Sequence, residues 1–222
     1  MTSSSSTKDK EKFYEARNSR GLDQKAIDLL IKYEVGGGKK YYDRYLRKPT
    51  WPGASSGVTV GIGYDLGYKS LNQIQLDWKG VVPQYKIDWM KGVHGLKKSA
   101  AKGALGRVDG LRIDWDDALE VFKKTTVPRF RLITEKAFPG VEKLHPYAYG
   151  ALVSLVFNRG GSLNGSRRLE MFKIRGLVAK KDYTGIAREI RAMKRLWSYK
   201  TLKGLHLRRD AEANLVDSAA KL

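Results

Sequence analysis

The sequence predicts an α+β fold, in which a small antiparallel β-sheet lobe packs beside a larger all-helical lobe. Val58, Val60 and Ile62 alternate with small or polar residues, which is the period-two pattern of a strand. From Ser70 onward, apolar residues instead recur at helical spacing. We therefore expect a sheet lobe over about residues 35–68 and a helical lobe over about 70–222, within one domain that spans 21–222.

The composition fits a folded protein without a metal or cofactor. The chain has 222 residues, of which 41% are hydrophobic, so one domain with a sizeable core is expected. There is no cysteine, and the three histidines lie far apart, so we expect neither a disulfide nor a metal site. Residues 1–20 are rich in serine and lack any periodicity, which predicts a flexible basic arm.

The net charge of +20 predicts attraction to polyanions. Nucleic acid is one such partner, and anionic envelope polymers or lipids are others. The basic residues are spread over the chain, and no helix-turn-helix, zinc or RNP pattern is evident. The longest apolar run, residues 151–157, is far too short for a membrane span. The first residues lack the apolar core of a signal peptide, so we expect synthesis in the cytoplasm.

Glu34 lies at the end of a predicted helix that Asp23 caps. The apolar residues of this helix form one stripe, which Glu34 continues: Ala26, Ile27, Leu30 and Ile31. Three glycines, 36–38, then end the helix. We expect Glu34 to face the interior in the last turn, where poor solvation favours a protonated carboxyl group.

A second carboxylate, Asp65, ends the glycine-spaced strand that contains Thr59. We expect residues 39–67 to form the small sheet, with Gly61 and Gly63 on one face of the strand. Two carboxylates on separate elements are what glycoside hydrolysis requires. A third, Asp43, lies between them, and its alternative explanation is a surface ion pair with Arg44 or nearby lysines.

The later chain predicts several helices and one mobile segment. Ser70 caps a helix over 71–78, and the lysine- and glycine-rich stretch 97–110 predicts a flexible loop. Residues 146–157 are apolar nearly all round, so they predict a buried helix. Further helices are expected after Pro83, after Asp114, and at about 167–178, 183–197 and 207–220.

These pieces, in this order, resemble the phage-type lysozymes of glycoside hydrolase family 24 and its relatives. The resemblance rests on the helix that ends at Glu34, on Thr-Val-Gly-Ile-Gly at 59–63, and on the buried helix that ends in Asn158-Arg159-Gly160. Residues 204–213 are similar to the arginine-rich C-terminal helix of this group. The form of 57–67, which ends Tyr-Asp-Leu-Gly, looks closest to the pesticin-like muramidase branch. The resemblance covers roughly residues 22–220.

The resemblance implies a lysozyme-like fold and a muramidase that hydrolyses the β-1,4 bond between N-acetylmuramic acid and N-acetylglucosamine. Glu34 would be the general acid. The short phage enzymes have their aspartate between the glutamate and the threonine, which points to Asp43. The pesticin-like branch has it six residues after the threonine, which points to Asp65, and we favour Asp65. Thr59 could hold the attacking water, which fits inversion, although retention stays open.

Asn158, Arg159 and Arg208 are the expected substrate-binding residues. Arg208 has an alternative, an ion pair with Asp210 or Glu212.

Under this interpretation the partner is bacterial peptidoglycan, with anionic envelope polymers or lipids held by the basic surface. We expect a monomeric endolysin-type enzyme that reaches the cell wall, in the periplasm, through holin-type release or secretion. Three alternatives remain: a nucleic-acid-binding protein, a wall-binding module that has lost catalysis, and a glycosidase of chitin or chitosan.

Overall fold

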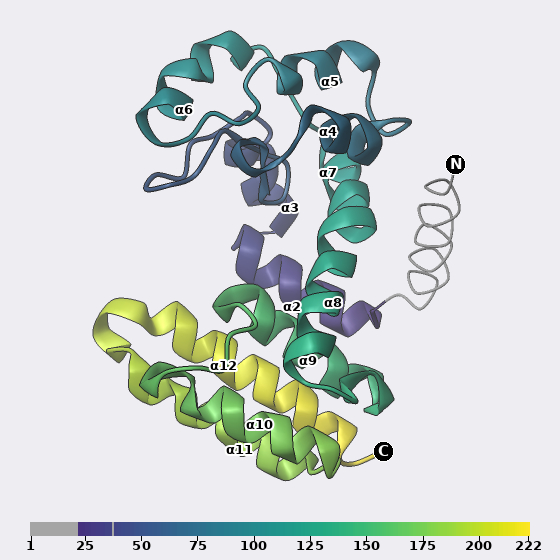
Figure 1. The fold of residues 1–222 in the computed structure, drawn as a ribbon, viewed down its shortest axis with the longest axis vertical. Helices are drawn as coiled ribbons and strands as arrows, with labels where there is room; N and C mark the ends of the chain where they lie inside the picture. The colour runs from purple at the N-terminus through teal and green to yellow at the C-terminus, as the bar shows by residue number, and fades with distance from the viewer. Residues whose placement is uncertain (1–21, 37) are drawn as a thin grey trace, which may run out of the picture. The chain divides into compact units, whose positions relative to one another are not determined.

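The computed structural model describes residues 22–36 and 38–222 (Figure 1), so the predicted arm at 1–20 lies outside the described part. The described chain is mostly helical and has a two-stranded antiparallel sheet. It divides into two compact units. One is Ile31–Val127. The other comprises Met1–Leu30, as far as it is described, and Pro128–Leu222.

The unit 31–127 contains the hairpin together with short helices. Its strands are β1 (Thr59–Val60) and β2 (Tyr64–Asp65). Its helical segments are α3 (Gly38–Tyr41), η1 (Tyr42–Leu46), η2 (Leu66–Tyr68), α4 (Leu71–Trp78), α5 (Gln84–Lys91), α6 (Lys98–Ala104), η3 (Leu105–Val108), α7 (Trp115–Val121) and η4 (Phe122–Thr126). The predicted sheet region 35–68 lies within this unit, which also includes the helices α4 to α7.

The other unit is built from longer helices. These are α8 (Val127–Ala137), η5 (Val141–Lys143), α9 (Pro146–Arg159), η6 (Ser166–Arg168), α10 (Leu169–Ala179), α11 (Tyr183–Ala192), η7 (Met193–Leu196) and α12 (Tyr199–Ala219). Helix α2 (Gln24–Val35) begins in this unit and ends in the unit 31–127. Among the residues described, no helix is both long enough and apolar enough to cross a membrane.

Helix α2 begins as the sequence predicts. The Asp23 carboxylate accepts a hydrogen bond from the Lys25 N–H at 2.8 Å, and the Asp23 carbonyl accepts from Ala26 and Ile27. The Asp23 side chain therefore satisfies one of the N–H groups that the first turn leaves without a helical partner. The predicted apolar stripe is buried at Ala26, Ile27 and Leu30.

The sheet is smaller than predicted. Thr59 pairs with Asp65 and Val60 pairs with Tyr64, so each strand has two residues. Gly61 and Gly63, expected inside a strand, have φ values of +58° and +69° and form the turn. Such values are in the left-handed region that glycine adopts without a steric penalty. The sequence predicted one strand that contains both Thr59 and Asp65, and this prediction is wrong, because the two residues lie on separate strands of a hairpin.

Residues 38–46, also predicted as part of the sheet, are helical instead. Tyr42 is fully buried in η1, and its hydroxyl donates to the Ile113 carbonyl at 3.1 Å. This long-range anchor is invisible to a pattern that considers neighbouring residues alone.

The prediction of a mobile loop at 97–110 is wrong. The structure has α6 and η3 there, and Ala101, Ala104 and Val108 are buried. The start of the segment is tied to the hairpin region, because Lys98 N–H donates to the Ser56 carbonyl at 3.0 Å.

Helix α9 is the buried centre of its unit, as predicted, and residues 148–156 are all buried. Helix α12 packs against α9 and α11, and α11 packs against α10 (Figure 1). Gly150 permits α2 to approach α9, since a Cβ at this position would lie 2.1 Å from the Ala26 Cβ. Helix α12 starts at Tyr199, earlier than the expected residue 207, and Leu202 has non-helical angles that mark a kink.

Candidate active site

The hairpin brings Thr59 and Asp65 directly opposite each other. The backbone N–H and C=O of Thr59 both form hydrogen bonds with Thr50, at 2.8 and 2.9 Å. These two groups therefore point away from Asp65. Thr59 and Asp65 are therefore a non-hydrogen-bonded pair, in which Cα atoms lie about 4.5 Å apart and the side chains share one face. Thr59 Oγ1 is buried and has no hydrogen-bond partner within the described chain.

Two backbone N–H groups fix the Asp65 carboxylate. Its Oδ1 accepts from Gly57 at 3.0 Å and from Gly67 at 2.8 Å, and its Oδ2 lies 3.2 Å from the Gly57 nitrogen. A carboxylate fills this acceptor role without a proton. The result is a half-buried acid with a fixed orientation beside a threonine hydroxyl.

The two glycines that hold Asp65 are required by close packing. A Cβ on Gly57 would lie 2.4 Å from the Gly67 nitrogen and 2.5 Å from Asp65 Oδ1. A Cβ on Gly67 would lie 2.7 Å from the Leu96 carbonyl. A side chain at either position would push the backbone away from the carboxylate. The spacing of Gly57, Asp65 and Gly67 is the sequence signal for this arrangement.

Beneath the hairpin, Tyr64 anchors β2 to α4. The Tyr64 hydroxyl donates to Asp77 at 2.7 Å, and its ring contacts Trp78 edge-on at a centroid distance of 5.4 Å. Burial, together with the hydrogen bond to Asp77, raises the pKa of the Tyr64 hydroxyl. The hydroxyl therefore remains a donor, and the strand that ends in Asp65 has a rigid support.

Glu34 lies in the last turn of α2, as predicted, but it is exposed rather than turned to the interior. The helix stripe shifts at this end, because Val35 is buried in place of Glu34. The expectation of poor solvation for Glu34 is therefore wrong. Its role as general acid stays a prediction that rests on the family resemblance.

Asp43 has the surface ion pair considered as its alternative explanation. Its carboxylate contacts Lys39 Nζ at 2.5 Å, and both side chains are exposed, at 39% and 57%. The partner is a lysine one helical turn earlier rather than the neighbouring Arg44. The choice of Asp65 rather than Asp43 as the second carboxylate stays a prediction.

Asn158 and Arg159 end α9, where Asn158 is exposed and Arg159 is half-buried. Arg159 Nη2 donates to the Arg167 carbonyl at 2.5 Å, and its guanidinium lies 5.1 Å from the centre of the Trp197 ring. Both residues belong to the helical unit, whereas Glu34, Thr59 and Asp65 belong to the unit 31–127.

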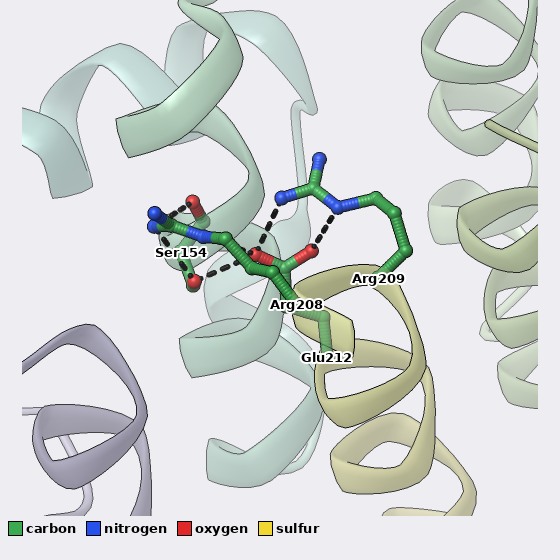
Figure 2. A network of polar contacts seen from close by, with 4 residues as sticks. All are labelled: Ser154, Arg208, Arg209 and Glu212. Carbon is green, nitrogen blue, oxygen red and sulfur yellow. Dashed lines mark hydrogen bonds and ion pairs between the residues drawn. The ribbon is translucent and has the colours of Figure 1, made fainter. Parts of the chain in front are cut away.

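Arg208 has the second of its two considered roles. It is only 3% exposed, its Nε donates to Glu212 at 3.2 Å, and its Nη2 donates to the Ser154 carbonyl at 3.1 Å. Arg209 contacts the same carboxylate at 2.9 Å, and Ser154 Oγ donates to it at 2.7 Å. Figure 2 shows Glu212 between the two arginines, with Ser154 from α9 closing the network. Arg208 thus joins α12 to α9.

No cluster of acidic, histidine or cysteine side chains in the described residues could hold a metal ion. The chemistry that the hairpin offers is that of a fixed carboxylate and a hydroxyl. This pair can orient a water molecule and stabilise positive charge.

Comparison with protein families gives two matches. The model described as Phage lysozyme matches residues 87–212, which is more than half of the chain. The chain belongs to the phage lysozyme family. This is a family of glycoside hydrolases whose activity is the hydrolysis of peptidoglycan. A model described as a domain of unknown function (DUF8812) matches residues 29–128. No curated protein matches the chain.

The two matches divide the predicted site residues. The phage lysozyme match includes Asn158, Arg159 and Arg208, whereas Glu34, Thr59 and Asp65 lie within residues 29–128. Membership in the phage lysozyme family is therefore carried by the helical part of the chain.

Proposed function

We propose that this enzyme is a muramidase that cleaves the β-1,4 bond between N-acetylmuramic acid and N-acetylglucosamine and so lyses bacteria. The observation that carries the proposal is the pairing of Thr59 with Asp65. The Asp65 carboxylate is held in place by hydrogen bonds from the N–H groups of Gly57 and Gly67. Membership in the phage lysozyme family supports the reaction class.

In the proposed reaction, Glu34 protonates the leaving oxygen, and Asp65 acts as the ionised partner. Thr59 Oγ1, on the same face as Asp65, would orient the attacking water, and Asp65 accepts the proton that this water loses. Attack by water fits inversion of the anomeric carbon, which requires about 6.5–9.5 Å between the two carboxyl groups. Asp65 follows Thr59 by six residues, and this spacing supports a pesticin-like arrangement.

Asn158 and Arg159 are the proposed contacts to the sugar substituents. The exposed Asn158 amide can both donate to and accept from an acetamido group. Arg208 supports these residues by holding α12 against α9, because its Nη2 donates to the Ser154 carbonyl of α9.

The charge of +20 would concentrate the enzyme at an anionic cell wall. We propose that it acts there as a monomer after holin-type release or secretion.

The test is the clearing of purified peptidoglycan by the wild-type protein and by Glu34→Gln. Glu34→Gln is expected to fold normally and to lose nearly all clearing, because an amide cannot donate the proton that the leaving oxygen needs. Glu142→Gln, at another exposed glutamate, is the matched control and should retain activity.

Retained clearing by Glu34→Gln would refute the assignment of the acid. A wild-type protein that binds peptidoglycan without releasing fragments would instead be a wall-binding module. Binding to plain duplex DNA with a steep salt dependence, without hydrolysis, would favour the nucleic-acid alternative.

A further inference from the structure

Three arginines of the helical unit lie near one another, and one of them packs on a tryptophan ring. This arginine cluster consists of Arg159 at the end of α9, Arg167 and Arg168 in η6, and Trp197 after η7. Arg159 lies against the Trp197 ring and donates to the Arg167 carbonyl. Arg167 Nη2 in turn donates to the Leu196 carbonyl at 3.4 Å. Segments from three parts of the chain thus converge on one basic site.

The cations of the arginine cluster repel one another. The pKa of Arg159 is lowered to about 10, first by burial and then by the positive charges of Arg168, Arg209 and Arg167. An anion bound among these guanidinium groups would relieve their mutual repulsion.

The nearby acids each contact another arginine, although the Glu170 carboxylate also attracts Arg159. Glu170 contacts Arg195, and Glu212 is shared by Arg208 and Arg209. In contrast, Arg159 Nε is buried and has no hydrogen-bond partner in residues 22–36 and 38–222. Arg167 is exposed and Arg168 is half-exposed, so solvent reaches the arginine cluster.

We propose that the arginine cluster binds a phosphate group. Guanidinium groups recognise phosphate through paired N–H donors, and a phosphate offers several oxygens to several arginines at once. The negative charge of the phosphate would compensate the positive charge of the arginine cluster, which the nearby acids do not neutralise. A phosphodiester of an anionic wall polymer and a phospholipid head group present the same chemistry. The site uses neither Glu34 nor Asp65, and it shares Arg159 with the proposed sugar contacts.

The first test measures binding of inorganic phosphate to the full chain at constant ionic strength, by calorimetry and by thermal melting. At ten times Kd, phosphate is expected to raise Tm by about 3–6 °C relative to chloride. Arg159→Gln and the double variant Arg167→Gln, Arg168→Gln should each weaken binding at least about tenfold, as the loss of a charge-assisted contact implies. Arg175→Gln, at an exposed arginine of α10, is the control and should bind as the wild type does.

Equal responses to phosphate and chloride in the wild type would overturn the proposal. Equal loss of binding in Arg175→Gln would also overturn it, because the effect would then be one of net charge. Binding is the readout rather than wall clearing, so this result is independent of the proposed muramidase reaction.

The second test identifies the source of the phosphate. Poly(glycerol phosphate) oligomers and phosphatidylglycerol vesicles are compared in co-sedimentation with the same variants. If a probe binds the wild type and Arg175→Gln but not the double variant Arg167→Gln, Arg168→Gln, the site is supported. The probe that behaves in this way identifies the source of the phosphate. If both probes bind and none of these substitutions weakens their binding, the proposed phosphate site is contradicted.

Discussion

Asp65 has two separable roles, and two substitutions at this position distinguish them. The carboxylate holds the N–H groups of Gly57 and Gly67, and it is also the proposed catalytic partner of Glu34. In Asp65→Asn, the amide oxygen can replace Oδ1 and accept from both glycines. The free energy of unfolding then falls only by the difference between charged and neutral hydrogen bonds, which is about 1–2 kcal/mol for the two bonds together.

Asp65→Ala removes both acceptors. Gly57 and Gly67 are buried, so two N–H groups lose their partner, at about 1–3 kcal/mol each. The free energy of unfolding should fall by about 2–6 kcal/mol, which lowers Tm by on the order of 5–20 °C for a chain of this size.

Melting curves and peptidoglycan clearing are measured on the same preparations. We expect Asp65→Asn to melt within a few degrees of the wild type and yet to clear no wall, whereas Asp65→Ala loses both stability and clearing. Full clearing by Asp65→Asn would refute the catalytic role. An Asp65→Ala protein as stable as the wild type would refute the reasoning from hydrogen bonds.

Three further substitutions test other parts of the structure. Asp43→Asn breaks only an exposed ion pair, so clearing should stay near the wild-type rate; if this variant alone abolishes turnover, Asp43 is the catalytic aspartate. Gly150→Ala should lower stability by about 1–3 kcal/mol through contact with Ala26, and Ala26→Gly should restore part of it in thermal melts, unless the two helices separate freely. Glu212→Gln leaves two buried arginines without their carboxylate, so denaturant unfolding should show a loss of about 3–5 kcal/mol; an unchanged midpoint would contradict the network in Figure 2.

The sequence was informative where a local signal coincides with a local structure. The Asp23 cap, the apolar stripe of α2 and the buried helix α9 are each encoded by adjacent residues, and the structure confirms them. The opposition of Thr59 and Asp65 was not predicted, because both residues were expected on one strand and the glycines between them form a turn instead.

The failures occur where distant contacts decide the structure. Residues 38–46 are helical around Tyr42, whose hydroxyl partner is 71 residues away. Glu34 follows the apolar stripe in sequence, but Val35 is buried in its place. Arg208 has an ordinary helical pattern, and only the approach of Ser154 from α9 shows that it is buried.

The central claim, that this protein is a muramidase, is tested most directly by the new reducing ends formed on purified peptidoglycan. Fragments are reduced with borohydride and analysed by mass spectrometry. We predict reduced N-acetylmuramic acid ends from the wild type and none from Glu34→Gln. Reduced N-acetylglucosamine ends, or intact glycan strands with the folded wild-type protein, would contradict the claim.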